Sequence, residues 1–360
     1  MTMDCDFLIV GGGVAGLSAA AELADLGSVL LTEAEAVFAR HASGRSAALY
    51  EPNYGRPPVV ALSLASGPSF QALPGVLSPR GMLLVARADQ ARAFDRDVAD
   101  MDLTPVPVEQ ARARLPILNP ATVAHAAIAD HAWDIDTDLF LRTCQRRARA
   151  AGARLMTRAA VTALSRTARG WQADTAQGSI TARVVVNAAG PWADAVAGLA
   201  GLAPLGIRPL RRSMARIPAP AGQDPARWPM VFGCGESWYM KPDAGALIVS
   251  PADEDPAEPH DAWPDDMVLA EGLARYQEMV TEPVTRLIAA WAGLRSFAPD
   301  RVPVLGPDPA DPAFVWCAGQ GGYGFQTAPA AARLLADLVA GRAPALDPAT
   351  VAALTPGRLR

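Results

Sequence analysis

A glycine-rich turn near the N-terminus, GGGVAG at residues 11–16, is the feature that most limits the fold of this chain. It follows DCDFLIV, a run typical of a buried parallel strand, and precedes LSAAAELADLG, which is typical of a helix closed by Gly27. A second apolar run, SVLLTEAE, begins directly afterwards. This order predicts a βαβ unit with the glycine-rich turn at the carboxyl end of its first strand.

The spacing Gly11-x-Gly13-x-x-Gly16 is typical of a turn that binds a dinucleotide. Glycines let the backbone approach a pyrophosphate closely, and the following helix offers free amide donors at its positive end. Glu33 stands 17 residues after Gly16 (33 minus 16), close to the spacing of about 20 expected for an acid that binds ribose hydroxyls. Strand, turn, helix and acid together predict a dinucleotide site.

The bulk composition narrows the class of protein further. The 360 residues exceed one typical domain, and 51% hydrophobic residues supply ample core. A net charge of −5 and the lack of a basic tract argue against nucleic-acid binding. The longest apolar run is too short to cross a membrane, so we expect no integral membrane segment and a cytoplasmic location. We expect the four separate cysteines to be buried free thiols, with no metal site: Cys5, Cys144, Cys234 and Cys317.

Two later segments repeat the strand–loop–helix pattern of the N-terminus. VVVNAAG at 184–190 precedes an apolar helix, and FVWCAGQGGYGF at 314–325 precedes another. Three remote segments that approach one dinucleotide favour FAD over NAD, because a helix N-terminus at the third would suit the anionic edge of a reduced flavin.

The predicted fold class is α/β. A Rossmann-like FAD-binding domain with a parallel sheet is joined to a mainly antiparallel α+β substrate domain, and both are discontinuous in sequence. We assign residues 1–75, 138–205 and 296–360 to the FAD-binding domain, and residues 76–137 and 206–295 to the substrate domain. Among the elements of the second domain, helices are predicted at 267–280 and 283–289.

Five segments together resemble the D-amino-acid oxidase family of flavoenzymes: GGGVAGLSAA, SGRSAA, VVNAAGPWAD, WAGLRSFAPDRVPVLGP and GQGGYGFQTAP. Within that family, RPLRRSM, SWYMKPDAGALIVSPADEDP and DIDTD are most similar to bacterial FAD-dependent D-arginine dehydrogenases. The resemblance runs in order along nearly the whole chain. It implies oxidative deamination of a D-amino acid, in which a hydride passes from Cα to flavin N5 and the imino acid hydrolyses to a 2-oxo acid and ammonia.

The resemblance also implies the residues that bind the substrate. Arg212 and Arg295 match the positions that hold the carboxylate, and the planar fork of arginine suits this role. The hydroxyls of Tyr54 and Tyr239 match positions at the same end of the substrate. The carbonyl of Gly322 matches the acceptor for the amine.

The family's cofactor contacts map onto each of the recurring segments. Ser43, Arg45 and Ser46 are expected to contribute polar groups near the flavin and its ribityl phosphate. The matching WAGLRSF segment has no cysteine, so the FAD is expected to be non-covalent. The remaining expected cofactor contacts are Gly11, Gly13, Val14, Ala15, Gly16, Glu33, Ala34, Ala47, Ala48, Val161, Ala189, Gly190, Gly321, Tyr323, Gly324, Phe325 and Gln326.

Three positions depart from the D-arginine dehydrogenase pattern. Met82 stands where a glutamate engages the substrate guanidinium in those enzymes, Leu49 replaces a histidine, and Glu51 replaces a threonine. Loss of the partner of a buried guanidinium is costly, so we expect a neutral or apolar D-amino acid as the substrate. Two alternatives stay open for Glu51: it replaces the lost acid and keeps basic substrates, or it is an exposed loop carboxylate.

Other readings of the sequence also stay open. The chain is alternatively a D-amino acid, glycine or sarcosine-type oxidase that releases H₂O₂, a flavoprotein scaffold without catalysis, or an NAD-dependent dehydrogenase. The electron acceptor is O₂, a quinone or another carrier, and the sequence does not choose among them. No side chain stands out as a general base, and His41, His125, His131 and His260 are expected to be structural or exposed.

Overall fold

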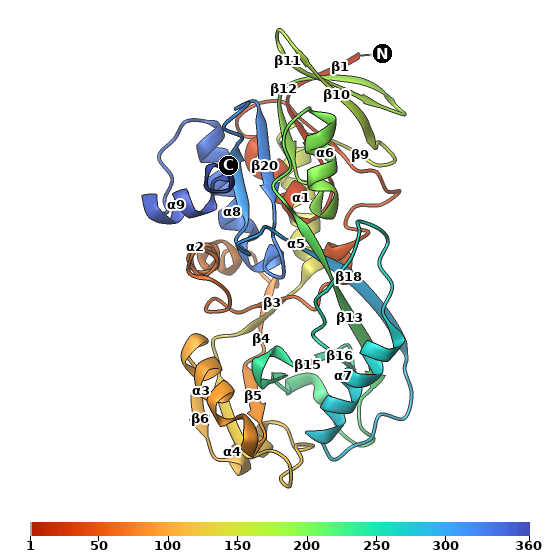
Figure 1. Cartoon of the computed structure of the whole chain (residues 1–360), viewed down its shortest axis with the longest axis vertical. Helices are drawn as coiled ribbons and strands as arrows, with labels where there is room; N and C mark the ends of the chain where they lie inside the picture. The colour runs from red at the N-terminus through yellow and green to blue at the C-terminus, as the bar shows by residue number, and fades with distance from the viewer. Residues whose placement is uncertain (1) are drawn as a thin grey trace.

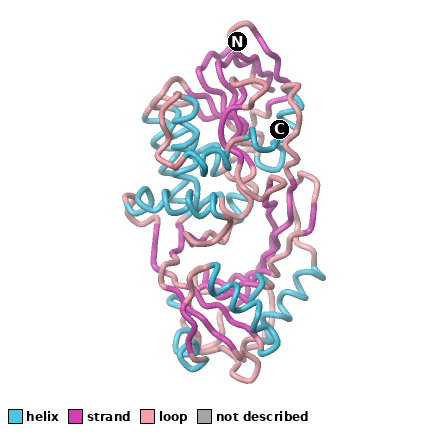
Figure 2. The backbone as a smooth tube through the Cα atoms, turned by 60° about the vertical axis from the view of Figure 1, so that its left-hand side comes forward, coloured by secondary structure: helices cyan, strands magenta, loops and turns pink. Residues whose placement is uncertain are grey.

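The computed structural model describes residues 2–360 and forms an elongated molecule with two lobes (Figure 1). Both chain ends lie in the upper lobe, and Figure 2 shows that several chain segments, not one linker, join the lobes. Each lobe is built around its own sheet, and a small third sheet lies where the lobes meet.

The sheet of the upper lobe has a parallel centre. Strands β9, β2, β1, β12 and β20 run parallel to their neighbours, and the antiparallel strands β10, β11 and β19 extend the edges. Its strands are β1 (Thr2–Val10), β2 (Val29–Thr32), β9 (Arg154–Met156), β10 (Val161–Thr167), β11 (Gly170–Thr175), β12 (Gly178–Asn187), β19 (Val304–Pro307) and β20 (Phe314–Ala318).

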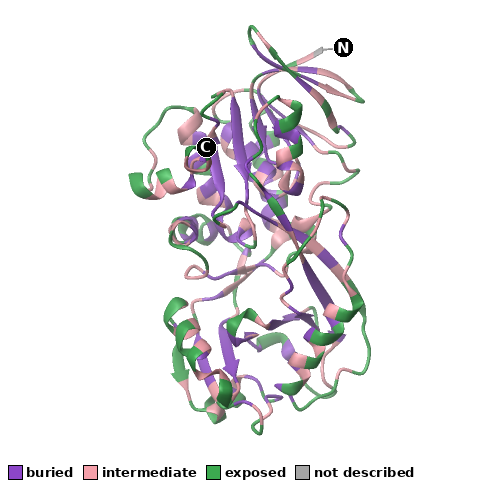
Figure 3. Cartoon of the chain, in the orientation of Figure 1, coloured by how far each residue is buried: buried purple, intermediate pink, exposed green. Residues whose placement is uncertain are grey.

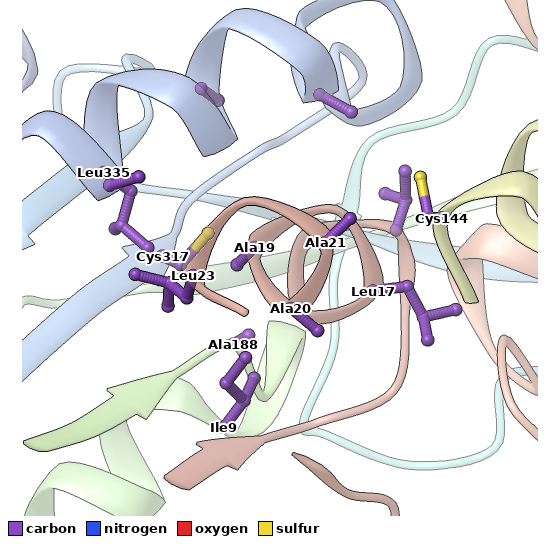
Figure 4. Close-up of a cluster of buried hydrophobic side chains, with 14 of the residues drawn as sticks. Ile9, Leu17, Ala19, Ala20, Ala21, Leu23, Cys144, Ala188, Cys317 and Leu335 are labelled. Atoms are coloured by element: carbon purple, nitrogen blue, oxygen red, sulfur yellow. The ribbon is translucent and has the colours of Figure 1, made fainter. Parts of the chain in front are cut away.

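The continuous apolar run of β1 is explained by cover on both faces of this sheet. Phe7 and Ile9 face one core, beneath the helices, whereas Leu8 and Val10 face a second core on the other side. Short alanines along α1 allow that helix to pack closely between the sheet and α8 (Figure 4). The helices of this lobe are α1 (Val14–Leu23), α2 (Pro57–Gln71), α5 (Thr137–Ala150), α6 (Ala193–Leu199), α8 (Gly324–Val339) and α9 (Pro348–Leu354).

The sheet of the lower lobe is antiparallel apart from the β5–β14 pair. Its order is β17-β13-β16-β15-β14-β5-β7-β6, with β18 beside β13. Helices α3, α4 and α7 cover it, with exposed outer faces (Figure 3). The elements are β5 (Met82–Ala86), α3 (Ala91–Asp100), β6 (Thr104–Val106), α4 (Val108–Arg114), β7 (His125–Ala129), β13 (Arg208–Pro218), β14 (Met230–Gly233), β15 (Trp238–Asp243), β16 (Ala246–Ser250), β17 (Asp255–Pro256), α7 (Asp266–Glu278) and β18 (Ala289–Phe297).

The third sheet lies between the upper and the lower lobe. Its order is β3 (Leu49–Tyr50), β8 (Trp133–Ile135) and β4 (Leu77–Pro79), all antiparallel. The elements of the upper lobe fall within 2–71, 137–199 and 304–354, and those of the lower lobe within 82–129 and 208–297. From this arrangement we propose the division into two discontinuous domains.

One predicted helix is wrong, and one cysteine is placed differently. Residues 283–288 form no helix, and Ala289 already belongs to β18. The amide of Ile288 donates to the carbonyl of Arg216 at 2.7 Å, so strand pairing with β13 prevails over the helical pattern of a segment too short to nucleate. Cys5 is half-buried, whereas Cys144, Cys234 and Cys317 are buried, and all four thiols are free.

Candidate active site

A cavity of about 1060 Å³ lies where the two lobes meet. Its wall is formed by the start of α1, the chain from residue 42 to 57, strands β13, β14 and β18, and the loop that leads into α8. The volume is at the upper end of the range of about 300–1,000 Å³ typical of ligand pockets. The cavity therefore has room for a ligand larger than a single amino acid.

The glycines of the N-terminal turn are required by close backbone contacts. Gly11 has φ +110°, and a Cβ there would lie 2.4 Å from the carbonyl oxygen of Ala188. A Cβ on Gly16 would lie 1.9 Å from the carbonyl oxygen of Gly11. Helix α1 begins at Val14, has no acidic residue in its first turn, and opens toward the cavity. The positive end of its dipole suits an anionic group.

Glu33 and Ser43 fix this turn from two sides. Glu33 accepts from the backbone N–H of Gly12 at 2.7 Å and from that of Glu35 at 2.9 Å. Since a carboxylate has about four acceptor positions, two stay available for hydroxyl groups. The hydroxyl of Ser43 accepts from the N–H of Val14 at 2.9 Å, so a cavity-lining serine sits at the start of α1.

A second helix N-terminus points at the same cavity. Helix α8 begins at Gly324, has no acidic residue in its first turn, and follows a tight loop against β18. In that loop Gly321 has φ +53°, and its N–H donates to the carbonyl of Ser296 at 2.8 Å. A Cβ on Gly321 would lie 2.3 Å from the ring of Phe297, which explains the glycine.

Arg212 and Arg295 are brought to the cavity by the pairing of β13 with β18. In the antiparallel register Arg295 lies opposite Leu210 and Arg212 opposite Gly293. Leu210 and Arg212 share one face of β13, so the two guanidinium groups lie diagonally on the same face. Both arginines line the cavity.

Glu254 is the counter-ion of this arginine pair. Its Oε1 lies 3.2 Å from Arg212, 3.8 Å from Arg295 and 2.8 Å from Arg301. Burial raises the pKa of Glu254, but Arg301, Arg212 and Arg295 together hold it below its ordinary value. Burial, followed by the charge of Arg295, lowers the pKa of Arg212. One carboxylate shared by three cations leaves this wall able to accept another anion.

Tyr54, Tyr239 and Gly322 line the cavity beside the arginines. The guanidinium of Arg212 lies over the ring of Tyr239 at 6.0 Å, and Tyr54 packs against Tyr323 with centroids 5.3 Å apart. Burial raises the pKa of Tyr54, so its hydroxyl stays protonated and able to donate. A Cβ on Gly322 would lie 2.8 Å from Cζ of Arg295, which makes this glycine a close neighbour of the guanidinium.

The side chain of Arg45 is engaged outside the cavity interior. It donates to the carbonyls of Ala262 and Ala292 and pairs with Asp261, so its guanidinium links the segment 42–48, here called the cofactor loop, to the lower lobe.

Lys241, which sequence reasoning did not identify, holds the next residues of that loop. Its Nζ donates to the carbonyl of Ala48 at 3.2 Å and to that of Ala47, and lies 2.8 Å from Asp134.

The three specificity positions are placed unequally. Leu49 and Glu51 line the cavity, whereas Met82 is fully buried in a cluster with Leu84 and Phe94 and does not line it. Leu49 and Phe232 pack against that cluster, so Met82 lies behind the cavity wall. The reading of Glu51 as an exposed carboxylate is wrong, because the residue is 3% exposed.

The cavity wall also contains acidic residues that the sequence did not reveal. Asp97 and Asp100 come from the last turns of α3, Asp102 follows that helix, and Glu236 lies in the turn after β14. Nothing local in the sequence of α3 signals that its end faces a cavity. Apolar residues line the same part of the wall: Met214, Met230, Phe232 and Trp238.

Most of the sequence-predicted cofactor positions also line the cavity. These are Gly13, Val14, Ala15, Ser43, Arg45, Ser46, Ala47, Ala48, Gly190, Gly321, Tyr323, Gly324, Phe325 and Gln326. The others do not line it: Gly11, Gly16, Glu33, Ala34, Val161 and Ala189. Gly11, Gly16 and Glu33 shape the turn and hold its amides, as described above.

The residues present fit an FAD molecule. Two helix N-termini without acidic first turns open on one cavity, and the turn before the first of them is shaped by Gly11 and Gly16 and held by Glu33, whose carboxylate keeps free acceptor positions. Within residues 2–360, no cysteine or histidine lines this cavity, in keeping with non-covalent binding.

A nucleotide-binding oxidoreductase is the class of protein that this fold and cavity define. The chain belongs to the family described as FAD dependent oxidoreductase (DAO), whose model matches residues 6–338. FAD is therefore its cofactor, which excludes the NAD-dependent reading.

Similar proteins include amino-acid oxidases and dehydrogenases. A glycine oxidase of Pseudomonas aeruginosa is 32% identical over 197 residues, 51% of each chain, and a D-amino acid dehydrogenase 2 of Ralstonia nicotianae is 49% identical over 65 residues, 18% of this chain and 15% of that one. The matches thus span about half or less of these curated relatives. The crystal structure of glycine oxidase from Geobacillus kaustophilus has the same fold, with a TM-score of 0.84, 24% identity, and coverage of 97% and 98%.

Proposed function

We propose that this FAD-dependent amino-acid oxidoreductase is a D-amino acid dehydrogenase. The hydrogen on Cα of a D-amino acid leaves with two electrons, the uncharged amine becomes the iminium form of the imino acid, and water hydrolyses it to a 2-oxo acid and ammonia. Bound FAD supplies the two-electron acceptor. The observation that carries the proposal is the arginine pair, Arg212 and Arg295, which lines the same cavity as the two helix N-termini.

The chain's own residues bind and orient the substrate. Arg212 and Arg295 hold its carboxylate, and the hydroxyls of Tyr54 and Tyr239 donate to the same group. The carbonyl of Gly322 accepts a hydrogen bond from the substrate amine. Such fixing of both polar groups presents the α-hydrogen in one orientation, which lowers the entropic part of the barrier. No side chain is assigned as a general base, since an amine that arrives uncharged needs none.

Anaerobic mixing of the purified holoprotein with single D- and L-amino acids tests this proposal. We expect a D-amino acid to bleach the visible flavin band and to yield 2-oxo acid and ammonia, each in a one-to-one ratio to flavin reduced. If only L-amino acids bleach the band, the assigned enantiomer is wrong. If no amino acid does so, the protein is a flavoprotein without this catalysis.

A glycine or secondary-amine oxidase is the second candidate function. The 32% identity to a glycine oxidase over half of the chain favours it. Admission of air to the reduced protein separates the two candidates. Fast re-oxidation with release of H₂O₂ after reduction by glycine or sarcosine indicates the oxidase, and slow re-oxidation indicates a dehydrogenase that uses a quinone or another carrier.

A further inference from the structure

Glu51 is a buried carboxylate with an incomplete set of partners. The residue is 3% exposed and lines the cavity. Its Oε1 accepts from the N–H of Asn53 at 2.9 Å and lies 3.1 Å from Nε2 of His131. Its Oε2 is buried and has no hydrogen-bond partner among residues 2–360. An unpaired buried carboxylate oxygen is costly, so its presence in a cavity wall indicates a missing donor.

A turn places Glu51 close to the substrate-binding tyrosine. The N–H of Tyr54 donates to the carbonyl of Glu51 at 3.2 Å, so residues 51–54 form a β-turn. The Cα atoms at the ends of such a turn are less than about 7 Å apart. An amino acid with its carboxylate near Tyr54 therefore needs only a long, unbranched side chain to reach Glu51.

The surrounding charges favour a cation over a neutral donor. Asp97, Asp100 and Asp102 line the same cavity, and the negative charge of Asp102 acts on Glu51 directly. Asp97 accepts from the N–H of Gly235 at 2.6 Å and is tied to the wall next to Glu236. Arg212 and Arg295 thus come from β13 and β18, whereas Glu51 and the three aspartates come from the 51–54 turn and the end of α3, an arrangement that suits a molecule with an anionic and a cationic end.

We propose that Glu51 determines substrate specificity by pairing with the terminal ammonium or guanidinium of a basic amino acid. This inference rests on the proposed function, and it replaces the preference for neutral side chains. That preference rested on the loss of a glutamate partner at position 82; Met82 does not line the cavity, whereas Glu51 places a buried carboxylate in its wall. The apolar residues Met230 and Phe232 would then contact the methylene part of the side chain.

Two unreactive probes test the subsite without turnover. The probe 6-aminohexanoate has the carboxylate and terminal ammonium of lysine but no α-amine, and hexanoate lacks the ammonium. Their dissociation constants for the holoprotein are measured by perturbation of the flavin spectrum. We expect 6-aminohexanoate to bind at least about 10-fold more tightly, and Glu51→Gln to abolish that preference.

Asp100→Asn is the matched control. Asp100 is exposed at the cavity wall, so screening by water should keep the change in affinity for 6-aminohexanoate below about 3-fold. An equal loss in both variants would indicate a general negative field and would overturn the specific pairing. Equal binding of the two probes to the wild type would also overturn it, and would mean that Glu51 has no partners beyond Asn53 and His131.

The affinity should also depend on pH. Burial, with Asp102 adding to it, raises the pKa of Glu51 to about 8, and the other polar groups that face the carboxylate are Asn53 and His131. A cation binds the ionised form, so affinity for 6-aminohexanoate should rise from pH 6 to about pH 8, with no such rise for Glu51→Gln. A flat profile for the wild type contradicts the pairing.

Turnover provides the second measurement. D-Norleucine is D-lysine without the terminal amine, and the ratio of their kcat/KM values isolates that group. We expect D-lysine to be favoured by at least about 10-fold in the wild type and not in Glu51→Gln. Turnover of D-norleucine with no preference for D-lysine overturns the subsite and leaves the proposed function standing. A preference for 6-aminohexanoate without turnover of any amino acid supports the subsite and overturns the proposed function.

Discussion

At the scale of single side chains, Arg295 is the residue on which substrate binding most depends in the proposed function. It lines the cavity, and its nearest anion, Glu254, is shared with two other arginines. We expect Arg295→Met to lower kcat/KM by about 10²–10³-fold, because the substrate carboxylate loses a charged partner in a buried site. Arg295→Lys should recover only part of this loss, since lysine lacks the planar fork. Steady-state kinetics measure both, and equal activity of Arg295→Met and the wild type would contradict the assigned role.

A substitution at Gly322 tests the role of the Arg295 guanidinium by displacing it. A Cβ at this position would lie 2.8 Å from Cζ of Arg295, so Gly322→Ala should displace the guanidinium. We expect kcat/KM to fall by about 10–100-fold with an unchanged flavin spectrum, because misplaced positioning groups are costly. Gly198→Ala, in α6, changes a glycine with no close neighbour and no positive φ, and controls for general effects of the added methyl group.

Glu51 should make stability depend on pH. Its pKa is raised from the ordinary 4.5 to about 8 in the folded protein, so folding favours its neutral form. The stability it contributes is full below about pH 4.5 and is lost as pH rises through 8. We expect the free energy of unfolding of Glu51→Gln to exceed that of the wild type by about 2–4 kcal/mol at pH 9, and to differ little from it at pH 5. Denaturant unfolding at the two pH values measures this, and a larger gain at pH 5 would contradict the shift.

At the scale of elements, the chain segment 46–50 depends on a buried ion cluster. Lys241, the only lysine of the chain, contacts the carbonyls of Ala47 and Ala48 and lies 2.8 Å from Asp134. Asp134 in turn accepts from Arg80 at 2.7 Å. Ala48 has φ +37°, a conformation that an alanine adopts only where the surroundings hold it. A compact ammonium fits these three acceptors better than a guanidinium does.

Lys241→Met should therefore loosen the cofactor loop. We expect a loss of about 2–4 kcal/mol in the free energy of unfolding, because two carbonyls lose their donor and Asp134 keeps only Arg80 as a cationic partner, and a weaker affinity for FAD. Lys241→Arg should not restore the wild-type value. Denaturant unfolding and FAD titration of the apoprotein give both quantities, and wild-type FAD affinity in Lys241→Met would show that the loop is held by other contacts.

The sequence revealed elements with strong local patterns and missed those set by tertiary contacts. The turn at Gly11 and the α5 helix were predictable from local residues. Helix α2 was not, since PPVVALSLASGPSFQ contains Pro68 and Gly67, which lower helix propensity, and its stability comes from packing on α8. The end of α3 at the cavity, and the burial of Glu51 beside His131, follow only from how the lobes meet.

At the scale of the whole molecule, the cavity is formed by both lobes. We propose that FAD binds there against residues 13–15 and the segments at 42–48 and 320–326, which line the cavity and belong to remote parts of the chain. Ligand binding to the folded state alone stabilises it by about 4 kcal/mol at a thousandfold excess over Kd. We expect saturating FAD to raise the Tm of the apoprotein and to slow its proteolysis, and an unchanged Tm would contradict a site between the lobes.

Within residues 2–360, no helix is long and apolar enough to span a membrane.

Rapid anaerobic mixing of the holoprotein with the D- and L-enantiomers of one amino acid tests the central claim most directly. The rate of flavin reduction is read for the wild type and for Arg212→Met with Arg295→Met. We predict fast reduction by the D-enantiomer alone, saturable in the wild type and at least about 100-fold less efficient in the double variant. Equal reduction by both enantiomers, or a double variant as efficient as the wild type, would contradict the claim that this cavity binds and oxidises a D-amino acid through its carboxylate.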